Sequence, residues 1–136
     1  MIEIKAHSTV ENENRAVAAI VKLVTEGGVT GLVDYISFSE NICRELIKSN
    51  PAHRVAYLNG NKTPEVLKTE GYFGLDYSMS VLRAHPDWVG KAIAAGIKTN
   101  VWTVNLPADM QYFIPLGVDF ITTDDPRELI KIVSGS

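Results

Sequence analysis

The sequence predicts an α/β fold built on a parallel β-sheet. Short apolar runs rich in β-branched residues recur along the chain, and longer segments with helical periodicity separate them. The apolar runs do not alternate with polar residues, which is typical of parallel strands covered on both faces. The chain has 136 residues, of which 46% are hydrophobic and 21% are charged. We therefore expect one domain over residues 1–136 with a single core.

Six strands are predicted from the apolar runs, and each is short, as is usual for strands in α/β proteins. They are expected at residues 2–6, 32–38, 54–58, 72–75, 97–104 and 118–122.

The helices between these strands have recognisable ends. The first is expected at residues 10–25 and stops at Gly27-Gly28, where a left-handed turn is available. Ser39 is a candidate cap for the second, which ends before Pro51 because proline lacks the amide hydrogen. Thr63-Pro64 and Asp125-Pro126 each resemble a cap followed by the first helical residue, with Glu128 completing a capping box after Asp125. A further helix is expected at residues 85–95, ending at Gly96.

Composition excludes several classes of protein. The formal net charge is -3 and the basic residues are scattered, which argues against nucleic-acid binding. No apolar run approaches the roughly 18 residues needed to cross a bilayer, and the first residues do not resemble an export signal. The single Cys43 has no partner for a disulfide and is expected to pack in the core. The sequence does not indicate the cellular compartment of the protein.

Two architectures fit the alternation of strands and helices, an open doubly wound sheet or part of a closed (β/α)8 barrel. The first would need a glycine-rich turn after its first strand to bind a nucleotide phosphate, and "IEIKAHST" contains no glycine. Instead Glu3 and Lys5 lie two residues apart on one face, opposite Ile2 and Ile4. Burying them would cost several kcal/mol unless they pair or bind something. A buried ion pair and a binding site both remain open.

Polar residues also follow other predicted strands, where parallel strands bring their carboxyl ends to one rim. Ser37, Asn105 and Thr123-Asp124 occupy such positions. Carboxylate oxygens suit a hard divalent cation and a lysine suits a phosphate, so this rim could hold both. Ser37 could equally precede a cap, and Asp124 could simply end the strand.

The strand motifs resemble the later strands of the glycerophosphodiester phosphodiesterase family. The resemblance is carried, in the family's order, by "IEIK" (2–5), "ISF" (36–38), "VAYL" (55–58), "VWTVN" (101–105) and "GVDFITTDDP" (117–126). It implies a (β/α)8 barrel that hydrolyses glycerophosphodiesters to an alcohol and glycerol 3-phosphate with a divalent cation, Ca²⁺ or Mg²⁺. The identity of the alcohol and of the metal stays open.

The resemblance also implies roles for matching residues. Glu3 would be one of three carboxylates that hold the cation, and Lys5 would be catalytic by contacting the phosphoryl oxygens and steadying their charge. Trp102 would lie beside the glycerol end of the substrate. Asn105, with Asp124, would shape the substrate-binding rim.

The family's early motifs are missing, namely "HRG", "PENT", the "E-D" pair and "HD", which supply the catalytic histidines and two metal carboxylates. Only His7, which shares the face of Glu3 and Lys5 if the strand continues, is a candidate for proton transfer. His53 and His85 are expected to be structural or exposed.

The chain therefore resembles strands three to eight of an eight-stranded barrel, an incomplete (β/α)8 TIM barrel of about six βα units. Unpaired edges invite another chain, so we expect self-association or an N-terminal barrel portion as partner. Three hypotheses follow. The chain is part of a phosphodiesterase and inactive alone, or a non-catalytic binding or regulatory domain derived from the same barrel, or a small α/β protein in which Glu3 and Lys5 form a structural ion pair.

Overall fold

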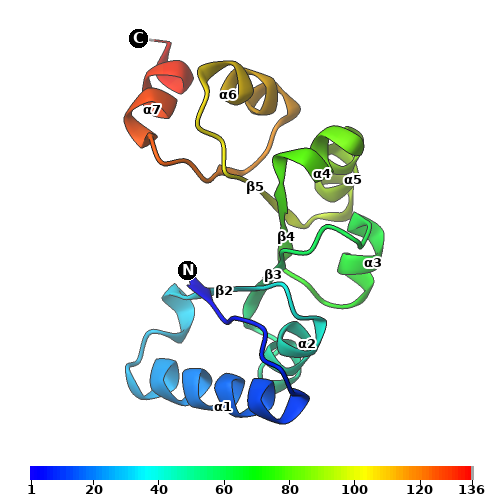
Figure 1. The fold of residues 1–136 in the computed structure, drawn as a ribbon, viewed down its shortest axis with the longest axis vertical. Helices are drawn as coiled ribbons and strands as arrows, with labels where there is room; N and C mark the ends of the chain where they lie inside the picture. Colours follow the sequence, from blue (N-terminus) through cyan, green and yellow to red (C-terminus); the bar gives the residue numbers. More distant parts are fainter. Residues whose placement is uncertain (136) are drawn as a thin grey trace.

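The computed structural model describes residues 1–135 as a curled, six-stranded parallel sheet with helices on its convex side (Figure 1). The strands pair in chain order, β1-β2-β3-β4-β5-β6, and every pairing is parallel. This is the α/β half-barrel that the sequence predicts. The strands are β1 (Ile2–Glu3), β2 (Asp34–Ser37), β3 (Arg54–Tyr57), β4 (Gly74–Ser78), β5 (Lys98–Trp102) and β6 (Phe120–Ile121).

The helices follow the strands around the outside of the arc, with α1 and α7 at its two ends (Figure 1). None of the helices within residues 1–135 is long and apolar enough to span a membrane. They are α1 (Val10–Glu26), α2 (Glu40–Ser49), α3 (Pro64–Thr69), α4 (Met79–Ala84), α5 (Trp88–Ala95), α6 (Pro107–Phe113) and α7 (Pro126–Ser134), with short 3-10 helices η1 (Thr30–Leu32) and η2 (Ile114–Leu116).

The predicted cap side chains are present, but the capping box at Asp125 is not formed, because the Asp125 N–H bonds to Thr123 Oγ1 and the Glu128 carboxylate pairs with Lys131. The side chains of Ser39, Thr63 and Asp125 each accept a hydrogen bond from the backbone N–H three residues later, which satisfies a donor that the first helical turn leaves unpaired. Gly96 ends α5 in the left-handed conformation, with φ of 71°.

The boundaries around β4 differ from the prediction. The strand begins at Gly74 rather than at residue 72, because Gly71 turns the chain at φ 84° and the Tyr72 N–H still bonds to Leu67. Its continuation to Ser78 was missed. Ser78 then caps α4, which was not predicted, and α5 begins at Trp88 rather than at residue 85.

The two outer strands are shorter than predicted. β1 ends at Glu3 and β6 covers only Phe120–Ile121, because each has a neighbour on one side alone. The short helix α6 was also missed.

The core lies between the sheet and the helices. Tyr35, Val55, Tyr57, Leu75 and Tyr77 project from the strands toward the helices and are at most 1% exposed. Because side chains alternate along a strand, the intervening residues face the concave side. That alternation places the site residues described next.

Candidate functional site on the concave face

Glu3 lies on the concave face of the sheet. Its strand partner is Ile36, which lines the hollow on that face, and paired residues of parallel strands point the same way. Lys5 follows the end of β1, and its ammonium nitrogen lies 2.7 Å from the Glu3 carboxylate. The Lys5 side chain is 77% exposed, so of the two alternatives left open by the sequence the buried ion pair is wrong, although the pair itself exists.

Trp102 ends β5 on the same face, two residues beyond Asn100. Its indole N–H donates a hydrogen bond to the main-chain oxygen of Asp76, with a nitrogen–oxygen distance of 2.8 Å. Phe38 meets the indole edge-on, with ring centroids 6.0 Å apart. The half-buried Trp102 is thus held by β4 and by the residue after β2, which gives this end of the sheet a fixed aromatic wall.

Asp76 and Asn100 are buried polar residues on the concave face that sequence reasoning missed. The Asn100 amide donates to Asp76 Oδ1 over 2.8 Å and to Thr122 Oγ1 over 2.9 Å, which links β4, β5 and the end of β6. Burial raises the pKa of Asp76 to about 6, the bond from Asn100 opposes this, and the nearby charge of Glu3 adds to it. The available signal was the continuation of the strand through "GLDYS", which places Asp76 inside the barrel.

The rim residues Asn105 and Asp124 lie next to each other. The Asn105 amide donates to Asp124 Oδ2 over 2.7 Å, and its oxygen accepts from the Asp124 N–H over 2.9 Å. Both are exposed. Their hydrogen bonds connect the loop after β5 to the loop after β6, at the rim formed by the carboxyl ends of the strands.

Ser37 does not join this rim. It is fully buried on the helix side, where its hydroxyl donates to the main-chain oxygen of Ile4 over 2.7 Å. The interpretation of Ser37 as a rim residue is therefore wrong, because alternation along β2 turns it away from the concave face. Its role is to tie β1 to β2.

The loop after β1 is anchored by Glu13, a second residue that the sequence did not single out. Its carboxylate is buried and accepts hydrogen bonds from the His7 N–H at 3.3 Å, the Ser39 hydroxyl at 2.9 Å and the Asn41 amide at 2.9 Å. A glutamate within an amphipathic helix gives no sequence signal of such burial. Glu13 fixes the chain just beyond Glu3 and Lys5.

The three histidines have no place on the concave face. His7 is exposed beside α1, where it borders a shallow hollow with Arg15 and Ala19. His53 is buried, with Nδ1 2.9 Å from the main-chain oxygen of Leu46, and His85 stacks on Trp88 at a centroid distance of 4.0 Å. The last two are structural, as expected.

Within residues 1–135, no three histidine, cysteine, aspartate or glutamate side chains are grouped so that they could hold a metal ion. Glu3 offers one carboxylate, part of which already bonds to Lys5. Asp76 is hydrogen-bonded to Asn100. These residues do not form a complete cation site by themselves.

The geometry defines the class of protein. The chain consists of consecutive βα units of a parallel barrel, and Glu3, Lys5 and Trp102 lie at the concave side of its sheet. The Glycerophosphoryl diester phosphodiesterase family model matches residues 2–128. The chain belongs to this family, and six consecutive strands of the family's TIM barrel make up its fold.

Known proteins similar to the chain carry the same family name. A glycerophosphodiester phosphodiesterase from Parabacteroides distasonis superimposes with a TM-score of 0.96 at 44% identity, over 98% of this chain and 56% of that one. A curated glycerophosphodiester phosphodiesterase from Caldanaerobacter subterraneus is 29% identical over 118 residues, which are 84% of this chain and 47% of that protein. The chain thus spans about half the length of these relatives.

A more distant structure shares the fold. It is an Oleispira antarctica phosphodiesterase in complex with the product sn-glycerol-3-phosphate, with a TM-score of 0.76 and 17% identity. The match covers 97% of this chain and 54% of the Oleispira antarctica chain.

Proposed function

We propose that the chain forms the C-terminal six βα units of a glycerophosphodiester phosphodiesterase. The reaction would hydrolyse a glycerophosphodiester to an alcohol and glycerol 3-phosphate. The observation that carries the proposal is the family match together with the placement of Glu3, Lys5 and Trp102 at one open face of the sheet. The product bound by the Oleispira antarctica phosphodiesterase supports a substrate of this class.

The proposed roles follow the chemistry of each side chain. Lys5 is exposed and carries an ammonium group that can reach beyond β1, which suits contact with phosphoryl oxygens whose negative charge grows during hydrolysis. Trp102 offers an apolar ring edge and face for the carbon atoms of the glycerol. Asn105 contributes an amide to the rim beside the substrate.

Glu3 is proposed as one ligand of a divalent cation, Ca²⁺ or Mg²⁺. A hard cation of this kind prefers carboxylate oxygens, and when bound it would polarise the phosphoryl group. Because the described residues supply too few carboxylates, the remaining ligands and the groups that transfer protons would come from polypeptide outside residues 1–136. We accordingly propose that the chain alone is inactive.

The proposed partner is the N-terminal portion of the barrel, with self-association as the alternative. β1 and β6 each have one unpaired edge, and an eight-stranded closure leaves room for two more strands.

A complementation assay tests the proposal. Hydrolysis of glycerophosphocholine with Ca²⁺ or Mg²⁺ is measured for the chain alone and for the chain mixed with a polypeptide that supplies the first two strands of the barrel. Activity is expected in the mixture only, and Glu3→Gln should abolish it. Glu11→Gln, an exposed carboxylate on α1, is the matched control and should keep it.

Two results would contradict the proposal. Activity of the chain alone would mean that an unassigned group transfers the proton. A correctly assembled mixture without activity would favour the second candidate function, a non-catalytic binding or regulatory domain derived from the same barrel.

A further inference from the structure

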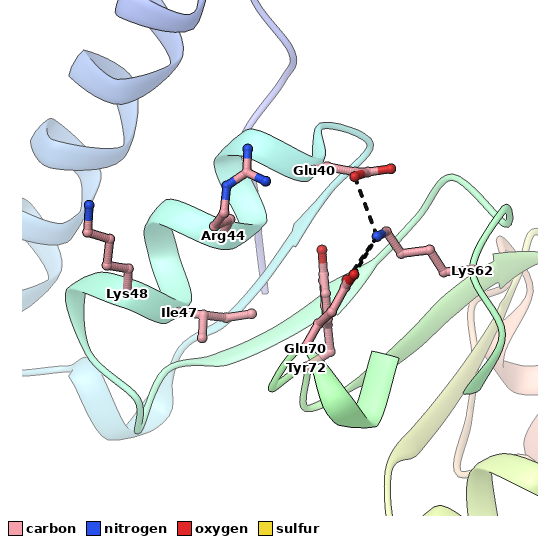
Figure 2. Close-up of a pocket in the computed structure, with 7 residues that line it drawn as sticks. All are labelled: Glu40, Arg44, Ile47, Lys48, Lys62, Glu70 and Tyr72. Atoms are coloured by element: carbon pink, nitrogen blue, oxygen red, sulfur yellow. Dashed lines mark hydrogen bonds and ion pairs between the residues drawn. The ribbon is translucent and has the colours of Figure 1, made fainter. Parts of the chain in front are cut away.

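The helix layer has a gap between α2 and α3. α2 packs against α1, whereas α3 packs against α5 and comprises only Pro64–Thr69. A pocket of about 410 Å³ opens between them (Figure 2). Its volume lies within the range of small-molecule sites in proteins, roughly 300 to 1,000 Å³.

This pocket is separate from the proposed catalytic face. α2 and α3 lie on the convex side of the sheet (Figure 1). Glu3 and Trp102 project to the other side, as their strand positions require. The walls of the pocket come from consecutive segments in the middle of the arc, from α2 to the residues just before β4. Closure of the barrel at β1 and β6 would therefore leave the pocket open to solvent.

One end of the pocket is closed by an ion-pair cluster in which one lysine bridges two carboxylates. The Lys62 ammonium lies 2.9 Å from a Glu70 oxygen and 3.4 Å from a Glu40 oxygen, and its side chain is only 14% exposed (Figure 2). The hydrogen bond to Glu70 is the main reason that the pKa of Lys62 is raised, so this lysine stays charged and paired. These three residues carry a net charge of -1, so an anionic group would lie away from them, at the other end of the pocket.

The remaining wall combines an apolar surface with an unpaired cation. Ile47 projects from α2 toward Tyr72 across the pocket (Figure 2). The Tyr72 ring packs against Tyr57, with centroids 5.7 Å apart. Arg44, one helical turn before Ile47, is exposed, and among residues 1–135 its guanidinium forms no ion pair or hydrogen bond.

We propose that the pocket between α2 and α3 binds a small amphipathic monoanion, a carboxylate on an apolar body. The apolar body would lie between Ile47 and Tyr72, and the carboxylate would bond to Arg44. A guanidinium donates two parallel hydrogen bonds to a carboxylate. Lys48 also lines the α2 wall, but it is paired with Glu45 at 4.0 Å, so Arg44 is the cation that remains for a single negative charge. A cationic ligand is disfavoured because Lys62 already occupies both carboxylates of the pocket.

The experiment is a titration of the ¹⁵N-labelled chain with sodium hexanoate, followed by amide chemical shifts. We expect saturable shifts in residues 44–48 and 70–72. Arg44→Gln should weaken binding about tenfold, because it removes the charge-assisted hydrogen bonds to the carboxylate and leaves the apolar contacts in place. Arg127→Gln, which removes an exposed arginine on α7, should leave it unchanged, and neutral 1-hexanol should bind more weakly than hexanoate.

Three results would overturn the proposal. They are the absence of saturable shifts around α2, equal affinity in the Arg44→Gln variant, and shifts centred on Asn100 and Trp102, which would place the ligand on the concave face. The first two are independent of the phosphodiesterase assay, because Arg44 and Ile47 have no part in the proposed catalytic site, and the third would report hexanoate binding at that site without any test of hydrolysis.

Discussion

The indole N–H of Trp102 donates to the main-chain oxygen of Asp76 over 2.8 Å, so that one residue of β4 supports two side chains of β5. The backbone of Asp76 orients Trp102, and its carboxylate holds Asn100. The proposed glycerol contact is therefore placed by the neighbouring strand and does not depend on a flexible loop.

Trp102→Phe should destabilise the chain without unfolding it. The change leaves the Asp76 carbonyl oxygen without its donor in a half-buried position, and the loss of such a bond typically costs about 1 kcal/mol. Urea denaturation followed by circular dichroism measures the change. An unfolding free energy equal to that of the wild type would mean that water replaces the indole N–H at no cost.

Asp76 should make stability depend on pH. Its pKa is raised from 3.8 in the unfolded chain to about 6 in the folded one, so the folded state binds the proton more tightly between these values. The unfolding free energy should therefore fall as pH rises from about 4 to 6 and stay lower above that, by at most about 3 kcal/mol.

Asp76→Asn provides the control for this pH dependence. The asparagine oxygen can still accept from Asn100, but it cannot ionise. Only the wild type should lose stability through this group as the pH rises. The variant should therefore become more stable relative to the wild type between pH 4 and 7. A constant difference across that range would show that Asp76 is not the titrating group.

Glu3→Gln should leave stability nearly unchanged. The Lys5 side chain is 77% exposed, and ion pairs at such positions contribute about 0 to 1 kcal/mol. Thermal unfolding at low and high salt measures the effect. A loss well above 1 kcal/mol would show that the pair stabilises the fold, whereas a small loss leaves the pair available for a site.

The Cys43 thiol should resist modification. It is fully buried, and burial raises its pKa to about 12, so it carries almost no thiolate at pH 8. A chromogenic disulfide reagent should react with it slowly in buffer and completely in denaturant. Lys48→Cys adds an exposed thiol on the same helix, and this one should react at once. Rapid reaction of the wild type would indicate that α2 opens locally.

The sequence predicted the parallel α/β fold and most helix ends, because caps such as Ser39 and stops such as Gly96 are local signals. Alternation predicted Glu3 and Lys5 on one face of the first strand, whereas the position of Trp102 came from the resemblance to the family, and its role stays a prediction. The sequence could not place Ser37 or Asp76, since a shift of one residue in strand register moves a side chain to the other face. Nor could it reveal the gap beside α3, which depends on α2 packing against α1 while α3 packs against α5.

A pair of glycine substitutions tests how closely β4 and β5 approach. A Cβ atom at Gly74 would lie 2.5 Å from the main-chain oxygen of Lys98, a distance that only a shift of the backbone can relieve. Gly74→Ala should therefore separate the strands and cost several kcal/mol, or prevent folding. Gly90→Ala is the matched control, because a Cβ there meets nothing within 4 Å and lies inside α5, where alanine should stabilise by roughly 0.5 to 1 kcal/mol. Opposite signs for the two variants in urea denaturation are expected. Equal effects would mean that the close approach of the strands is not what requires glycine at residue 74.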